Sequence, residues 1–253
     1  MKEWIEEMNL NAWPALQTVL YDGWVLRFAE GYSKRSNSVT PLYPSRKEDI
    51  AAKIDECESM YQRNNLPPVF KITPFETSEL DLALHKRGYQ SVDITLVLIC
   101  DLTENTIRDR WLGETLRKHV TIESRVSHSW LQQLCQFNSL KREYMDTAYR
   151  MLTASPLQQG FFTLYDGEEP AACGFCVVQA GHAGIYDIVT DPRRRRRGYA
   201  QELIQRMLVW AQANGAAHAY LLVVEDNLAA RKLYEKLDFS ELYKYGYRVK
   251  SSI

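Results

Sequence analysis

The 253-residue sequence lacks an excess of charge of either sign, because 31 basic side chains balance 32 acidic ones. Proteins that bind nucleic acid normally carry a basic excess that attracts phosphate, so this balance argues against such a partner. The sequence also lacks any apolar run near the roughly 20 residues that span a bilayer. Its acidic first residues do not include the apolar stretch of a secretory signal. We therefore expect a cytoplasmic protein that binds neither membrane nor nucleic acid.

Cysteine and histidine are scarce, with five residues of each type. An odd number of cysteines, in a chain large enough to fold without disulfides, fits a reducing compartment. Cys173 and Cys176 have the C-x-x-C spacing, but strand formers surround them, whereas a redox motif needs its first thiol at a helix N-terminus. No second cysteine pair stands at zinc-binding spacing, and the histidines are scattered. We predict two small strand residues here and no metal site.

Strand and helix patterns alternate along the chain, which predicts an α/β fold. A charged segment, residues 101–117, is interpreted as the connection between two lobes plus a first strand of the second lobe. The predicted domains are therefore residues 1–100 and 101–253. The predicted helices cover the first residues, 47–64, 78–86, 129–138, 141–152, 199–213 and 228–237. The predicted strands cover 24–29, 38–43, 69–72, 92–100, 161–165, 171–179, 184–190, 219–224 and 243–249.

The two halves repeat the same order of predicted elements at a shift of 150 residues. The strand at 38–40 then matches residues 188–190, and the helix that ends at Asn64 matches the helix that ends at Asn214. Residue identity along this comparison is near chance, so the repeat is one of pattern only. It indicates an internal duplication, although two unrelated α/β lobes can also share such a pattern.

The most informative stretch is the run Val189-Thr-Asp-Pro-Arg-Arg-Arg-Arg-Arg-Gly-Tyr-Ala200, which lies between a predicted strand and a predicted helix. A loop at this position directs free backbone N–H groups and the positive end of the helix dipole at one point, which favours a phosphate. Gly198 and Ala200 have little or no side chain, so a ligand can approach the backbone closely. The arginines add charge that suits phosphate. The alternative is a solvated basic turn or a nucleic-acid patch.

The run Arg195-Arg-Arg-Gly-Tyr-Ala200 resembles the Arg/Gln-x-x-Gly-x-Gly/Ala signature of the GNAT (GCN5-related N-acetyltransferase) superfamily. The resemblance continues in Asn227, Ala230 and the segment Leu233-Tyr-Glu-Lys-Leu-Asp-Phe239, where Asp238 replaces the family's glycine. It implies a mixed, mostly antiparallel central sheet flanked by helices, in which the fourth and fifth strands of the catalytic lobe splay apart. It also implies a transferase that uses acetyl-CoA and no metal.

The resemblance carries family roles to particular residues of this sequence. The residues implied to bind acetyl-CoA are Arg195, Arg196, Arg197, Gly198, Tyr199 and Ala200 at the pyrophosphate, Ile188, Val189 and Thr190 at the pantetheine arm, and Asn227 at that arm or the following loop. Tyr234 is implied to protonate the departing thiolate. Asp187 is the candidate base for the amine, directly or through water, although a structural role for it is nearly as well supported, and Glu225 is a weaker alternative. Strand alternation predicts that only one of Tyr186 and Asp187 faces the acceptor.

The first half fails the same requirements at the shift of 150 residues. Gly198 is matched by Glu48, Ala200 by Ile50, Asn227 by Thr77 and Tyr234 by Leu84. We therefore expect a degenerate GNAT-like lobe without a cofactor site, which walls the acceptor cleft through candidates such as Trp24, Tyr32, Arg35 and Asn37. Its sequence has a weaker resemblance to the first lobe of two-lobed GNAT proteins.

The leading hypothesis is an N-acetyltransferase that moves the acetyl group of acetyl-CoA to a primary amine, on a small molecule or a protein, within a ternary complex. One alternative is an acyl-CoA sensor without turnover, which has no need of a proton donor such as Tyr234. Another is an acyltransferase that uses a longer acyl-CoA. A monomer and a homodimer are both compatible with the sequence.

Overall fold

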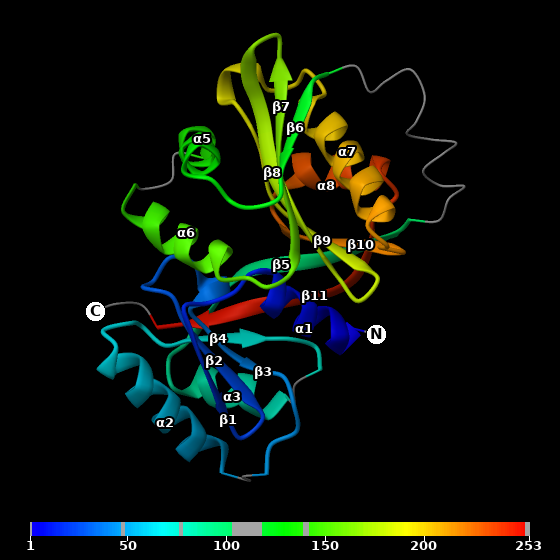
Figure 1. Ribbon diagram of the computed structural model, residues 1–253. Helices are drawn as coiled ribbons and strands as arrows, with labels where there is room; N and C mark the ends of the chain where they lie inside the picture. Colours follow the sequence, from blue (N-terminus) through cyan, green and yellow to red (C-terminus); the bar gives the residue numbers. More distant parts are fainter. Residues whose placement is uncertain (1, 47–48, 76–77, 103–117, 139–141, 251–253) are drawn as a thin grey trace. The chain divides into compact units, whose positions relative to one another are not determined.

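A computed structural model describes residues 2–46, 49–75, 78–102, 118–138 and 142–250 (Figure 1). These residues form two compact units. The first unit consists of residues 1–96, 224–226 and 242–253, and the second consists of residues 97–223 and 227–241. Two strands, β5 (Gln90–Asp101) and β11 (Ser240–Val249), contribute residues to both units. No helix within the described ranges is long and apolar enough to cross a membrane.

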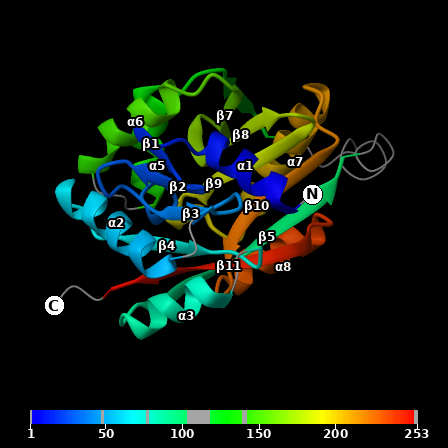
Figure 2. The same cartoon turned by 90° about the horizontal axis from the view of Figure 1, so that it is seen from below.

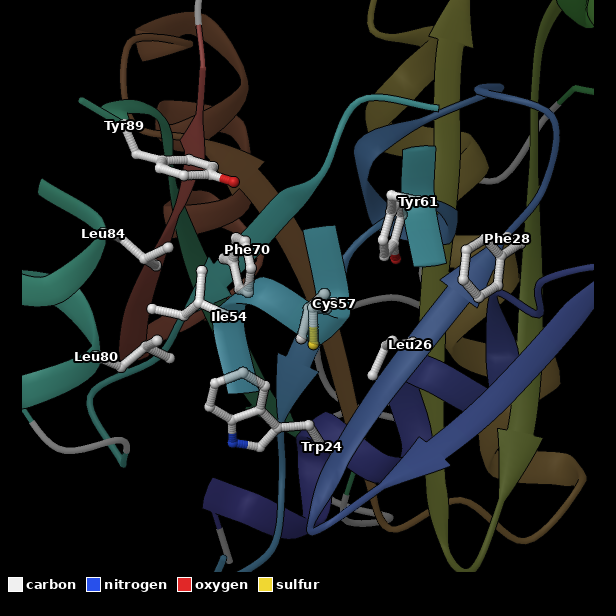
Figure 3. Packing of buried hydrophobic residues seen from close by; sticks show 11 residues of the cluster. Trp24, Leu26, Phe28, Ile54, Cys57, Tyr61, Phe70, Leu80, Leu84 and Tyr89 are labelled. Carbon is white, nitrogen blue, oxygen red and sulfur yellow. The ribbon is translucent and has the colours of Figure 1, made fainter. Parts of the chain in front are cut away.

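The sheet of the first unit has its apolar face toward two helices. Its neighbouring strands are β1 (Gln17–Tyr21), β2 (Trp24–Phe28), β3 (Val39–Pro41), β4 (Val69–Ile72) and β11, antiparallel except for β3 beside β4. The helices α2 (Ile50–Arg63) and α3 (Ser78–Lys86) supply the other half of the core. Figure 3 shows the packing, in which Phe70 meets Trp24 and Tyr89 edge-on at centroid distances of 6.3 and 5.5 Å. Such pairs stabilise a core by about 0.5–1.5 kcal/mol beyond area burial.

The opposite face of this sheet is polar and is covered by α1 (Lys2–Ala12), which Figure 2 shows across the strands from α3. The side chain of Arg27 donates hydrogen bonds to the carbonyl oxygens of Leu10 and Trp13 at the end of α1. Lys71 forms an ion pair with Glu6 at 2.5 Å, and both side chains are almost completely buried. Since buried charge is costly without a partner, these contacts hold α1 in one register on the sheet.

The second unit is built on the strand order β10-β9-β8-β7-β6. The strands are β6 (Val120–Glu123), β7 (Gln158–Asp166), β8 (Glu169–Gln179), β9 (His182–Thr190) and β10 (His218–Val224). β9 and β10 are parallel, and the other neighbours in this order are antiparallel. The helices are α5 (His128–Asn138), α6 (Met145–Thr153), α7 (Tyr199–Ala213) and α8 (Leu228–Lys236), with short 3₁₀ turns at Arg142–Tyr144 and Pro192–Arg194.

Aromatic residues fix which helix covers which face of the second sheet. Trp130 of α5 packs edge-on against Phe161 and Phe175 at centroid distances of 5.0 and 6.1 Å. On the other face, Phe162 meets Trp210 of α7 at 5.7 Å. Successive residues of a strand point to opposite faces, so Phe161 and Phe162 separate the two helix layers. Figure 1 shows α5 and α6 on one side of β7 and β8 and α7 on the other.

The predicted mixed, mostly antiparallel sheet with flanking helices is confirmed. The helix predicted at 199–213 has those bounds, and the one at 78–86 is α3. Cys173 and Cys176 lie in strand β8, as predicted, and both are buried. Two strands were not predicted, β1 and β6, and both are edge strands. The predicted first strand of the second lobe falls mostly within 103–117, which lies outside the described residues.

The repeat at 150 residues extends to the backbone of the turns. α3 and α8 have bounds shifted by this number, and so have the starts of β5 and β11. Asn65 and Gly215 both have positive φ after their helices, and Gly88 and Asp238 form a second such pair. A left-handed residue commonly ends a helix, and aspartate tolerates this conformation. Asp238 therefore serves where the GNAT signature has glycine. The shared turns support an internal duplication.

Candidate active site

The centre of β9 contains a bulge at Asp187. Cys173 of β8 faces Val189 and Phe175 faces Tyr186, so one more residue lies on β9 than on β8 between these pairs. Asp187 has a φ of 51°, in the left-handed region that aspartate enters more readily than most residues. The bulge interrupts strict alternation between Tyr186 and Val189. The direction of the Asp187 side chain therefore does not follow from alternation, on which the sequence-based choice between Tyr186 and Asp187 depended.

Beyond this bulge, β9 has one open edge. The parallel ladder between β9 and β10 runs from His182 opposite His218 to Ile185 opposite Leu221. Both strands continue past this point, but among the described residues no further pairing joins them. The other edge of β9 stays bonded to β8, where Val189 pairs with Cys173 and Thr190 with Ala172. The predicted splay between these two strands is thus present, and it leaves the backbone of residues 188–190 accessible from one side.

The loop after β9 presents backbone N–H groups at the start of a long helix. Asp191 begins the loop, and its carboxylate accepts a hydrogen bond from the N–H of Arg193 at 2.9 Å. Gly198 is the N-cap of α7 with a φ of 82°, and no side chain caps this helix. A Cβ at Gly198 would meet no atom within 4 Å, so the space beside it is open. Uncapped N–H groups and the helix dipole make this terminus a suitable place for an anion.

The five arginines of the loop divide into two groups. Arg193 and Arg194 form ion pairs with Asp191, and Arg194 and Arg197 form ion pairs with Asp166. Arg195 and Arg196 are exposed, and no ion pair is recorded for them within the described ranges. Three guanidinium groups thus belong to the loop's own structure, and two are available to a ligand.

Asp166, which sequence reasoning used only as part of a turn signal, is the centre of this ion-pair cluster. It lies at the turn between β7 and β8 and accepts a hydrogen bond from Lys118 Nζ at 2.7 Å and from Arg194 Nη1 at 3.0 Å. Hydrogen bonds from Lys118 and Tyr199 lower the pKa of its carboxyl to about 2. The sequence shows the turn, but not that its carboxylate meets a loop 28 residues later.

The helix α8 carries the two remaining family positions. Asn227 is its N-cap, and the side-chain oxygen accepts a hydrogen bond from the N–H of Ala230 at 3.2 Å. The cap is therefore Asn227 rather than Asp226. Tyr234 is 9% exposed and packs edge-on against Phe239. Burial raises the pKa of its phenol to about 12, so this side chain keeps its proton at neutral pH.

The remaining acidic and thiol groups have partners or surroundings that limit their roles. Glu225 accepts a hydrogen bond from Lys244 Nζ at 2.7 Å. Burial, followed by the charge of Asp187, raises the pKa of the Cys173 thiol, and burial does the same for Cys176. A thiol kept protonated is a poor nucleophile and a poor metal ligand. Among the described residues, no group of three or more His, Cys, Asp or Glu side chains could hold a metal ion.

The structure brings most of the predicted cofactor positions to one edge of the second unit's sheet. Parallel strands end at the same edge, so the loop after β9 and the start of α8 after β10 both lie there. The candidates in the first unit are used differently. Trp24 lies in the core under Lys53, and Asn37 bonds the backbone of Ala29 and Gly31. Tyr32 stacks on Trp13. Glu48 and Thr77 lie outside the described residues.

Comparison with known families gives one match across nearly the whole chain. The family model described as "Probable histone acetyltransferase Rv0428c C-terminal" matches residues 4–248. An uncharacterized N-acetyltransferase, YobR of Bacillus subtilis, is 30% identical over 248 residues, which is 97% of each chain. The ribosomal protein bS18-alanine N-acetyltransferase of Escherichia coli is 31% identical over 80 residues, 32% of this chain and 54% of that protein.

Solved structures share the fold at low sequence identity. A GCN5-related N-acetyltransferase from Kribbella flavida superposes with a TM-score of 0.71 at 14% identity, over 99% of this chain and 96% of that one. A tandem GNAT protein from the clavulanic acid biosynthesis pathway superposes with a TM-score of 0.69 at 10% identity, over 96% and 86% of the two chains. Such identities carry the fold alone.

Proposed function

This chain belongs to the Rv0428c C-terminal acetyltransferase family, a GNAT-type family of N-acyltransferase enzymes, and from this we propose that it transfers the acetyl group of acetyl-CoA to a primary amine. The relatives named above include an enzyme that acetylates a protein alanine. The proposed acceptor class accordingly covers amines on proteins as well as on small molecules.

The end of the β9–β10 ladder at Ile185 is the observation that carries the proposal. An extended arm with amide groups needs a strand edge that no other strand occupies, and residues 188–190 provide one. The pyrophosphate of the same ligand needs backbone N–H groups and positive charge directly beyond that edge. The loop from Arg195 to Ala200 fits this need, since Gly198 leaves open space and Arg195 and Arg196 are exposed. Asn227 is exposed at the same edge, where its amide would meet the arm.

The proposed chemistry is direct attack without a covalent enzyme intermediate. The amine nitrogen forms a bond to the thioester carbonyl carbon, and the carbon–sulfur bond breaks as CoA thiolate departs. The N–H of Val189 would donate to the carbonyl oxygen as negative charge develops there. Tyr234, still protonated because of its raised pKa, would donate its proton to the sulfur. The amine's proton would leave through Asp187 or a water beside it, since an alkylammonium has no free electron pair to attack with.

In this proposal the catalytic domain is residues 101–253, and residues 1–100 form a GNAT-like lobe without a cofactor site. Val39, 150 residues before Val189, is paired with Phe70 of β4. The edge that is open in the second unit is therefore closed at the equivalent place in the first. Leu84, which stands where Tyr234 stands, is completely buried in the apolar core (Figure 3). A lobe built in this way offers neither the strand edge nor the proton donor.

The test is an assay of the purified protein with acetyl-CoA and a panel of amines, including peptide N-termini, lysine side chains and small polyamines. The proposal predicts release of free CoA thiol that depends on the amine, with an equal amount of acetylated amine by mass spectrometry. Binding of acetyl-CoA without turnover for any amine would favour the sensor. Faster turnover with a longer acyl-CoA would change the donor and leave the site unchanged.

A further inference from the structure

The turn between β7 and β8 holds the loop before α7 through one carboxylate. Asp166 accepts hydrogen bonds from Lys118 at 2.7 Å and from Arg194 at 3.0 Å, and Arg197 lies 3.8 Å away. Tyr199, the first residue of α7, also donates a hydrogen bond to this carboxylate. The contacts on Asp166 therefore come from both sides of Gly198, the residue with the left-handed conformation.

Lys118 connects this cluster to the first turn of α7. Its backbone N–H donates a hydrogen bond to the Glu202 carboxylate at 2.7 Å, and its ammonium lies 5.5 Å from the centre of the Tyr199 ring. Asp166 is 22% exposed, so its ion pairs are partly shielded from water. One carboxylate thus joins the hairpin turn, the strand before β6 and the start of the helix.

A carboxylate at this place is unfavourable for anion binding if charge alone matters. Asp166 carries a negative charge at all pH values above about 2 and sits among the arginines that a pyrophosphate would approach. Its field weakens the attraction that Arg194, Arg197 and Lys118 exert on an anion. A gain that offsets this loss has to come from geometry, because four flexible cationic or hydroxyl side chains are held in one arrangement by a single acceptor.

We propose that Asp166 is a positioning residue for the donor site, which holds the loop from Arg194 to Tyr199 in the conformation that receives the pyrophosphate of acetyl-CoA. The inference rests on the proposed function and adds a residue that the family signature does not contain. Binding strength improves when a loop is ordered before the ligand arrives, since the ligand then does not have to order it. Positioning and charge make opposite predictions for the loss of this carboxylate.

The experiment is isothermal titration of acetyl-CoA into the full chain, with Asp166→Asn beside the wild type. The matched control is Glu168→Gln, which removes an equal charge from an exposed residue of the same turn. Positioning predicts that Asp166→Asn raises the Kd about tenfold while Glu168→Gln leaves it within twofold. An unchanged or lower Kd in Asp166→Asn would overturn the inference, because removal of repulsion alone has that effect.

Two further readouts separate positioning from a loss of stability. Steady-state kinetics of Asp166→Asn should show a raised KM for acetyl-CoA with kcat at saturation nearly unchanged, since the residue touches no reacting atom. Asp166→Glu, which keeps the charge, should recover most of the affinity. A parallel fall of kcat in both variants would contradict the inference. Absence of binding by the wild type would instead contradict the proposed function itself.

Discussion

Leu84 and Tyr234 occupy equivalent places in two helices that are 150 residues apart. The carbonyl of Leu84 accepts a hydrogen bond from the N–H of Tyr89 at 3.1 Å, and that of Tyr234 accepts one from the N–H of Phe239 at 3.0 Å. The same helix end thus presents an apolar side chain in the first unit and a phenol in the second. A duplicated backbone accounts for this relationship, with chemistry kept in one copy only.

The first prediction concerns this phenol. Tyr234→Phe removes the hydroxyl and keeps the ring that packs against Phe239. Because a positioned proton donor typically contributes 10²–10⁴-fold, we expect kcat to fall by about 100-fold or more. The Kd for acetyl-CoA should stay within about twofold of the wild type. Both are measured on the purified variant by CoA release and by titration. A variant that retains more than about a third of the wild-type kcat removes Tyr234 from the mechanism.

The second prediction concerns the ion pair below α1. Glu6 also accepts a hydrogen bond from the hydroxyl of Tyr243, so one buried carboxylate serves two partners. Lys71→Met leaves Glu6 buried beside a neutral side chain, and we expect the free energy of unfolding to fall by about 3–5 kcal/mol. The double variant Glu6→Leu with Lys71→Met should regain most of that loss. Urea denaturation of the full chain measures both, and a single variant as stable as the double one contradicts this account.

The third prediction is a loss of stability at alkaline pH. Burial raises the pKa of Cys57 and of Cys100 from 9.0 to about 12. The thiols of the unfolded chain ionise above pH 9, while those of the folded chain stay protonated until about pH 12. The folded state therefore binds more protons in this window, and the free energy of unfolding is full below pH 9 and falls as the pH rises. Urea midpoints at pH 8, 9.5 and 10.5 give the slope, which Cys57→Ala should reduce. A flat profile would falsify the assignment.

Local patterns predicted most of the elements because each depends on residues close in sequence. The end of α7 follows from Asn214 and Gly215, and its start from the glycine loop. The edge strands β1 and β6 were not predicted, because four of the five residues of β1 are exposed and none of β6 is fully buried. Without a buried face, an edge strand has no regular apolar alternation to reveal it.

The donor loop was predicted from sequence in position and in residues, but its internal partners were not. Five consecutive arginines look equivalent in the sequence, and only the fold shows that Arg194 meets Asp166 while Arg195 stays exposed. The bulge at Asp187 also depends on pairing with β8, which local sequence does not encode. Glu6 and Lys71 are charged residues far apart in the chain, so patterning places both at the surface. Contacts over long sequence separations are what the local patterns lack.

The central claim is that the loop at the start of α7 binds acetyl-CoA, and titration of acetyl-CoA into Gly198→Glu tests it most directly. The matched control is Gly215→Glu, at the other end of the same helix. Both glycines have positive φ, at 82° and 87°, and a side chain at either would meet no atom within 4 Å. The two variants therefore share the backbone strain and the added charge, and differ in their position. We predict micromolar binding by the wild type and by Gly215→Glu, and none by Gly198→Glu. Equal binding by all three proteins, or none by the wild type, contradicts the account.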